Sequence, residues 1–252
     1  MSQIMVMPVP ETQGDAEVPT RDRRAALEAL LRSPRLGGAV QIASAQAQTK
    51  GVSEIGLLPV SEQLRPLLPG GGLPRGSTVS LTASAGLLWE LLATPSANGA
   101  WVAVVGQPAL ARAILAAVDA GLDASRLLLV PEPGDRWPEA VAALLDGADV
   151  VVAAPSGVIT GGLARQLTAR ARQRGAVLVS FGTAWPGADV VLEPTASVWR
   201  GPRAGRGRLR DRELEVTCRG RGNSSQPRKA TLRLHAGLSS GSAQPAVLMA
   251  TR

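Results

Sequence analysis

The sequence predicts an α/β protein whose mainly parallel sheet is flanked by helices and carries antiparallel strands at its C-terminal edge. Between residues 58 and 194, short runs rich in Val and Leu alternate with stretches that repeat apolar residues at helical spacing. After Pro194 the helical periodicity ends, and strand-like segments follow one another directly. Alternating strands and helices are typical of a parallel sheet, because each crossover between parallel strands needs a connection about as long as a helix.

Six apolar runs are the predicted strands of the parallel part. They cover residues 77–82, 100–105, 126–130, 149–153, 176–181 and 188–192. Apolar residues at helical spacing predict helices over residues 109–120, 137–145 and 163–174. Gly121 and Gly175 follow two of these helices, and a glycine in this position favours the left-handed turn that ends a helix.

Three later runs are the predicted edge strands. They cover residues 195–200, 213–218 and 230–235, and turns rich in Gly and Arg join them. Successive strands with such short connections pair in the antiparallel sense, so we expect them at one edge of the sheet.

The chain divides into four predicted regions. Residues 1–19 are rich in Pro and lack periodicity, which indicates a disordered tail. Residues 20–57 contain an N-terminal helix over 21–32 and a linker, residues 58–235 form the folded core, and residues 236–252, rich in Ser, Gly and Ala, form a flexible tail.

Composition narrows the class of protein. Apolar residues make up 45% of the 252 residues, which is enough for one substantial core. Cys218 and His235 are the single residues of their kinds, so the chain has no internal disulfide and no site built from several His or Cys ligands. We expect no metal and no cofactor. The sequence has neither a secretory-signal pattern nor a long apolar run, so we expect a cytoplasmic protein without membrane contact.

The five tryptophans are expected in two environments. Trp89 and Trp101 lie in apolar runs and are expected in the core. Trp137, Trp185 and Trp199 lie beside Pro or Arg, which favours partial exposure and a role as interface anchors. Cys218 lies in a predicted strand and is expected to be buried as a small apolar residue.

Positive charge is concentrated near the C-terminus. The segment from Arg200 to Arg233 has eleven basic and three acidic residues, whereas the rest of the chain has a net charge of −1. Such a field attracts nucleic-acid phosphates or an acidic protein surface, although a solvated face of the edge strands is an alternative. The expected contact residues are Arg200, Arg203, Arg206, Arg208, Arg210, Arg219 and Arg221.

A motif in the first half of the core resembles the entry to the ATP site of RecA-type recombinases. Gly72, Leu73, Pro74, Arg75 and Gly76 precede an apolar strand, as a similar turn does in that family. There the strand leads into a glycine-rich phosphate loop with a lysine and a hydroxyl residue, which neutralise the phosphates and hold Mg²⁺.

The residues that should perform this chemistry are replaced. The loop reads Ala83, Ser84, Ala85 and Gly86, with one glycine and no lysine. A plain turn between strand and helix is the reading that we favour for this segment.

Three further positions of the nucleotide site are also replaced. After the following strands, Gln107 stands where the family has a catalytic Glu, Ala154 where it has a Mg²⁺-supporting Asp, and Thr183 where it has a Gln that senses the γ-phosphate. We therefore assign no catalytic residue and expect a pseudo-ATPase with a RecA-like sheet.

Among RecA relatives, the chain resembles the ImuA and ImuA-prime accessory proteins of the actinobacterial mutasome. This resemblance implies a non-catalytic role in SOS-induced translesion synthesis and mutagenesis, bridging an ImuB-like Y-family polymerase homologue and an error-prone replicative-type polymerase. DNA or RecA would be further contacts, and the protein would join the nucleoid after DNA damage.

Two alternatives come from other functional classes. One is a SulA-like cell-division inhibitor, since that family is also RecA-like and lacks ATPase chemistry. The other is a DNA-stimulated ATPase with an unorthodox site.

Overall fold

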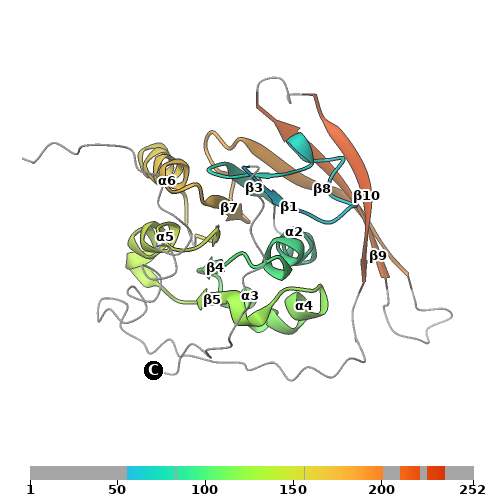
Figure 1. Cartoon of the computed structure of the whole chain (residues 1–252), viewed down its shortest axis with the longest axis horizontal. Helices are drawn as coiled ribbons and strands as arrows, with labels where there is room; N and C mark the ends of the chain where they lie inside the picture. Colours follow the sequence, from blue (N-terminus) through green and yellow to red (C-terminus); the bar gives the residue numbers. More distant parts are fainter. Residues whose placement is uncertain (1–55, 83, 156, 201–210, 222–225, 236–252) are drawn as a thin grey trace, which may run out of the picture.

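The computed structural model describes residues 56–82, 84–155, 157–200, 211–221 and 226–235, and Figure 1 shows their arrangement. The N-terminal tail, the helix expected over 21–32 and the C-terminal tail therefore lie outside the described residues. The strands of the main sheet are β3 (Thr78–Leu81), β4 (Val102–Val105), β5 (Leu127–Val130), β6 (Val150–Ala153), β7 (Val177–Phe181), β8 (Val190–Arg200), β9 (Asp211–Gly220) and β10 (Arg228–His235).

The main sheet has the predicted mixed character. Its eight strands have the order β10-β9-β8-β3-β7-β6-β4-β5. The strands from β8 to β5 pair in parallel, whereas β8 with β9 and β9 with β10 pair antiparallel. The prediction of a mainly parallel sheet with C-terminal antiparallel edge strands is confirmed.

Helices cover both faces of the parallel part. They are α2 (Ala85–Ala97), α3 (Pro108–Arg112), α4 (Ile114–Asp119), α5 (Trp137–Leu145) and α6 (Gly161–Arg174). In Figure 1, α5 and α6 lie on one side of the strands and α2, α3 and α4 on the other. Two separate apolar cores result, one on each face of the sheet. None of the helices in the described ranges is long and apolar enough to cross a membrane.

A small hairpin precedes the main sheet and was not predicted. It pairs β1 (Leu57–Pro59) with β2 (Gly72–Pro74) in the antiparallel sense. One-turn helices η2 (Pro69–Gly71), η3 (Ala124–Arg126) and η4 (Gly134–Arg136) complete the described elements. A Cβ atom at Gly72 would lie only 2.7 Å from the Leu58 carbonyl oxygen, so the hairpin needs glycine there.

Two element boundaries differ from the prediction. The expected strands over 188–192 and 195–200 are one strand, β8, because an irregularity in its pairing with β9 at Pro194 and Ala196 accommodates the proline. The helix expected over 109–120 divides into α3 and α4 at Ala113, whose ψ of 15° departs from helical geometry.

Two of the five tryptophans are more buried than predicted. Trp89 is in one core as expected, and Trp101 is half-buried against the core on the other face of the sheet. The prediction of exposure is wrong for Trp137 and Trp185, which are only 8% and 4% exposed, and it is confirmed for Trp199, which is 48% exposed.

Cys218 lies in β9 with its side chain in the core, as predicted. Burial raises the pKa of its thiol, because the charged thiolate is poorly solvated there, and the opposing effect of the Arg228 charge is smaller.

Carboxylates fix the amino ends of the parallel strands. Asp189, directly before β8, accepts hydrogen bonds from the backbone N–H and the hydroxyl of Thr78, both at 2.9 Å, and from Arg172 at 3.1 Å. Asp149, directly before β6, pairs with Arg75 at 2.9 Å and accepts a bond from the backbone N–H of Trp101 at 3.0 Å. These bonds join the starts of neighbouring strands that are far apart in the sequence.

We expect Asp189→Ala to lower the free energy of unfolding by about 2–4 kcal/mol, because it leaves the Thr78 donors and Arg172 without their charged acceptor. Urea unfolding followed by circular dichroism measures this change. The exposed Asp135→Ala variant removes the same charge and should stay within about 0.5 kcal/mol of the wild type. Equal stability of the two variants would contradict the structural role of Asp189.

Candidate functional site

The residues that the resemblance places at the nucleotide-site positions gather at the carboxyl edge of the sheet. Ser84 follows β3, Gln107 follows β4, Ala154 follows β6 and Thr183 follows β7. These four strands are neighbours in the order β3-β7-β6-β4 and run in the same direction. The loops therefore meet at one edge, as the resemblance predicted, while Ala83 lies outside the described residues.

The connection from β3 to α2 is short. Only residues 82–84 separate the two elements, so Ala85 and Gly86 belong to the first helical turn and not to a phosphate-binding loop. Ser84 is the N-cap residue with extended backbone, and its side chain makes no capping hydrogen bond. Its Oγ is buried and has no hydrogen-bond partner within the described part of the chain. Ser84 thus lies in a short connection between strand and helix.

The one glycine of this segment serves packing. A Cβ atom at Gly86 would lie 3.1 Å from Cδ1 of Leu234, which is closer than most such contacts. Leu234 belongs to β10 and is only 8% exposed, and β10 contacts α2. The missing side chain of Gly86 thus lets an edge strand lie against the start of α2, where a phosphate-binding helix must stay open to its ligand.

The ends of β4 and β6 touch through their backbones. A Cβ atom at Gly106 would lie 2.2 Å from the Ala154 carbonyl oxygen, and the φ of Gly106 is 87°. The next residue, Gln107, has a φ of 53° and is the one non-glycine with positive φ among the described residues. Its exposed amide side chain cannot accept a proton as a carboxylate does, and Ala154 contributes only a buried methyl group.

The loop after β7 is held by its own hydrogen bonds. The Ser180 hydroxyl donates to the Thr183 carbonyl oxygen at 2.7 Å, and the backbone N–H of Trp185 donates to the Ser80 hydroxyl at 3.3 Å. The Trp185 indole N–H donates to Thr168 at 3.0 Å. Thr183 thus lies in a loop that is tied back onto the sheet and onto α6.

The predicted basic surface is divided by the structure. Arg200 ends β8, opposite Asp211, while Arg219 and Arg221 lie at the other end of β9, where Gly220 pairs with Val190. A ten-residue strand spans about 30 Å, so these arginines do not form one patch. Arg219 lies 3.7 Å from Glu193, and Arg203, Arg206, Arg208 and Arg210 lie outside the described residues.

Several residues near these sites were missed by sequence reasoning. Leu234, Arg172 and Asp189 carry no motif, and their roles depend on contacts between distant segments. The alternation of Leu232 and Leu234 in a predicted strand is the one signal that marks Leu234 as facing the core.

We expect Gly86→Val to lower the free energy of unfolding by about 1–3 kcal/mol, because the added side chain collides with Leu234. The same substitution in a Leu234→Ala background should cost about 1 kcal/mol less. Urea unfolding of the double-mutant cycle measures the coupling. Gly162→Val, at an exposed glycine of α6 with nothing within 4 Å, is the control and should be close to neutral. Absence of coupling would show that β10 does not pack on α2 in this way.

Comparison with known proteins gives the family. Residues 66–187 match the family model described as the MT3502 N-terminal domain. The chain is 37% identical over 165 residues to the uncharacterised protein Rv3395c of Mycobacterium tuberculosis (strain ATCC 25618 / H37Rv), a match that covers 62% of this chain and 80% of that protein. A crystal structure of the RadB recombinase is similar with a TM-score of 0.45 and 16% identity, over 68% of this chain and 93% of that chain. On the basis of the sequence match, the chain belongs to the same protein family as Rv3395c.

Proposed function

We propose that this protein is a non-hydrolysing accessory protein of DNA-damage-induced translesion synthesis. In this proposal it holds an ImuB-like Y-family polymerase homologue and an error-prone replicative-type polymerase together, with DNA or RecA as further contacts. The observation that carries the proposal is the carboxyl edge of the parallel sheet, where packing has replaced the groups that a nucleotide site needs.

The chemistry of this edge supports the absence of hydrolysis. A triphosphate with Mg²⁺ needs a cation at the phosphates, a carboxylate near the metal and a group that positions water. The corresponding positions here are Ser84, Gln107, Ala154 and Thr183, none of which carries a charge. Each such group supplies several kcal/mol of barrier lowering, so their joint loss leaves hydrolysis near the uncatalysed rate.

The packing of the edge supports the same conclusion. Leu234 lies against Gly86 at the first turn of α2, and the Ala154 carbonyl oxygen lies against Gly106. These contacts use the backbone surfaces that a phosphate loop presents to its ligand. Binding of a triphosphate at α2 would require β10 to move and would expose apolar surface.

A candidate partner surface begins beside this closed site. Trp199, Arg212 and Leu234 are neighbours across β8, β9 and β10, so they lie on one face of the edge strands. The Arg212 guanidinium lies 5.3 Å from the centre of the Trp199 ring and donates to the Ser197 hydroxyl at 2.7 Å. Exposed Trp and Arg side chains are enriched among residues that dominate protein interfaces. We assign this pair to partner contact.

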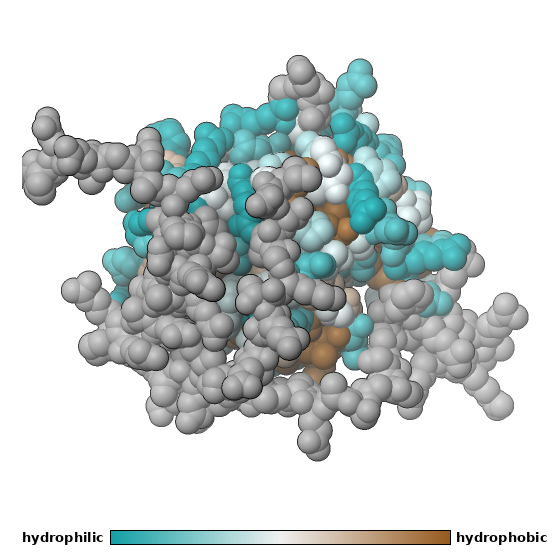
Figure 2. Space-filling model, in the orientation of Figure 1, coloured by the Kyte–Doolittle hydropathy of each residue, from teal (hydrophilic) through white to brown (hydrophobic). Residues whose placement is uncertain are grey.

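Apolar surface also occurs elsewhere on the molecule. Figure 2 shows polar residues over most of the visible described surface and an apolar area near α3 and α4. Val158, which follows β6, is exposed and apolar but lies apart from the edge strands. It therefore offers a control position for tests of partner contact.

We expect no ATP turnover above background, with or without single-stranded DNA, because the edge lacks both the cation and the carboxylate of an ATPase site. Release of phosphate from ATP and Mg²⁺ measures this. An active ATPase preparation in the same assay is the positive control. DNA-stimulated turnover that disappears when Ser84 and Gly86 are replaced would refute the proposal and favour the unorthodox ATPase.

Affinity capture from cells treated with a DNA-damaging agent tests the partner class. The full chain should recover the Y-family homologue and the error-prone polymerase, and Trp199→Ser should reduce recovery about ten-fold, because truncating a central interface aromatic costs at least about 1–2 kcal/mol. Val158→Ser should leave recovery unchanged. Recovery of the cell-division polymer instead would favour the SulA-like alternative.

A further inference from the structure

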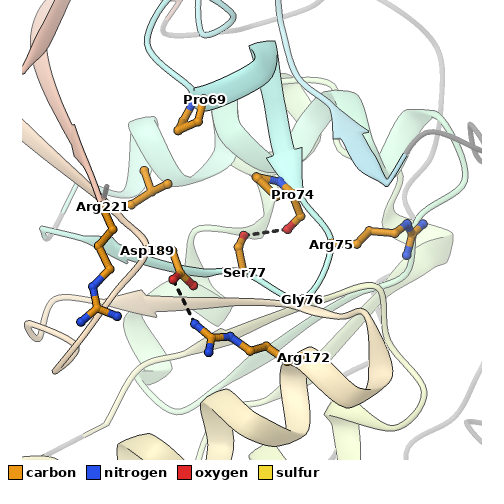
Figure 3. Close-up of a pocket in the computed structure, with 9 residues that line it drawn as sticks. Pro69, Pro74, Arg75, Gly76, Ser77, Arg172, Asp189 and Arg221 are labelled. Atoms are coloured by element: carbon orange, nitrogen blue, oxygen red, sulfur yellow. Dashed lines mark hydrogen bonds and ion pairs between the residues drawn. The ribbon is translucent and has the colours of Figure 1, made fainter. Parts of the chain in front are cut away.

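A groove of about 420 Å³ lies at the opposite, amino edge of the sheet. Figure 3 shows it between the η2 and β2 segment, which contributes Pro69 and Pro74, and the amino ends of β3 and β8. Arg172 from the end of α6 and Arg221 after β9 complete its basic side. Its volume is within the range of about 300–1,000 Å³ typical of small-molecule sites.

The one acidic residue that lines the groove is already satisfied by the protein. One oxygen of Asp189 accepts both hydrogen bonds from Thr78, and the other accepts the bond from Arg172. The Arg172 bond uses one of the five N–H donors of that guanidinium, so most of its donors stay available to a ligand. The negative charge of Asp189 is balanced by Arg172 alone.

Arg221 adds a second positive charge on the same side of the groove. Its backbone N–H donates to the Asp189 carbonyl oxygen at 3.1 Å, which fixes its position beside the carboxylate. Its guanidinium lies beside Gly187. A Cβ atom on that glycine would be 3.5 Å from a guanidinium nitrogen of Arg221. Among the described residues no carboxylate pairs with it.

The third arginine of the lining does not alter this balance. Arg75 forms an ion pair with Asp149 at 2.9 Å, and in Figure 3 its side chain points away from Asp189. The groove is therefore left with one net positive charge, carried on the side where Arg172 and Arg221 lie. The opposite wall is apolar, because it consists of Pro69 and Pro74.

From this arrangement we propose that the groove binds a phosphate group carried by a nucleotide-sized ligand. Planar guanidinium groups donate in pairs to phosphate oxygens, which makes arginine well suited to this anion. The proline wall suits the sugar or base, since a lone phosphate would fill only a small part of the volume. The site is separate from the carboxyl edge, so the proposal does not depend on the proposed function.

The phosphate can come from a free nucleotide or from single-stranded DNA, and the test separates these sources. Equilibrium dialysis measures binding of adenosine 5′-monophosphate, adenosine and inorganic phosphate to the full chain. Fluorescence anisotropy measures binding of a short single-stranded DNA with and without a 5′-phosphate. Arg221→Gln removes the unpaired cation, and Arg136→Gln, at an exposed arginine of η4, removes the same charge elsewhere.

We expect the wild type to bind the monophosphate at least about five-fold more tightly than adenosine, because charge-assisted hydrogen bonds depend on the phosphate. Arg221→Gln should weaken binding about five-fold, Arg221→Lys should weaken it less, and Arg136→Gln should leave it unchanged. All variants should keep the wild-type unfolding midpoint. If Arg221→Gln weakens binding of the 5′-phosphorylated DNA alone, the groove binds a terminal phosphate. If it weakens binding of both DNAs, the groove binds the phosphates of the DNA backbone.

Three results would overturn the proposal. The first is equal binding of adenosine and its monophosphate, and the second is equal affinity of Arg221→Gln and Arg136→Gln for the monophosphate. The third is displacement of the monophosphate by acetate as effectively as by inorganic phosphate, which would show a general anion surface and not a phosphate site.

Discussion

The carboxylate of Asp189 is the contact on which the arrangement of the sheet depends. It joins three segments that are distant in the sequence: the start of β3, the start of β8 and the end of α6. β3 lies between β7 and β8, where the parallel part of the sheet meets the antiparallel edge strands. Together with the backbone pairing of β3 and β8, this carboxylate therefore positions the edge strands relative to the parallel core. A partly buried charge is stable there because each oxygen has donors.

The same type of contact recurs along the amino edge. Asp149 binds Arg75 and the backbone of Trp101, and Asp146 accepts hydrogen bonds from both Arg170 and Arg174. The hydrogen bond with Asp146 raises the pKa of Arg170, because it stabilises the charged guanidinium. Charged interactions thus hold the amino edge, whereas neutral hydrogen bonds and contacts of backbone and apolar side chains hold the carboxyl edge. Because of this division, the positively charged groove lies at the amino edge of the sheet and the neutral strand-end loops lie at its carboxyl edge.

The sequence predicts the bounds of an element well where the signals for it lie within that element. The buried run at β6 and the helix α5 have the predicted bounds to within a residue, because four apolar residues between turns and a proline at the first turn are local signals. The sequence predicts a break at Pro194, but this residue lies beyond the part of β8 that pairs with β3, and the pairing irregularity with β9 beside it accommodates the lost N–H. The proline neighbours of Trp137 and Trp185 predict partial exposure, yet both side chains lie in the core between α5, α6 and the sheet.

The candidate sites show where sequence reasoning reaches its limit. The meeting of Ser84, Gln107, Ala154 and Thr183 follows from the alternation of strands and helices, because the ends of parallel strands share an edge. The contact of Leu234 with Gly86 joins the last described strand to the first helix of the core, and no local pattern encodes it. The basic residues form one block in the sequence, but the ten-residue strand β9 separates Arg200 at one of its ends from Arg219 and Arg221 at the other.

Two residues at the carboxyl edge, Gln107 and Ser84, are held in energetically unfavourable states by the packing around them. Positive φ at Gln107 costs on the order of 1 kcal/mol or more, and it persists only where the surroundings leave no alternative. The close approach of Gly106 to the Ala154 carbonyl oxygen supplies that constraint, because the chain must turn sharply before α3 can begin. The Ser84 hydroxyl, which has no hydrogen-bond partner within the described part of the chain, is likewise enclosed at the start of a helix whose first turn is covered by Leu234. At an edge built for catalysis such costs would serve the orientation of a ligand. Here they follow from contacts between protein atoms, which maintain the shape of the edge.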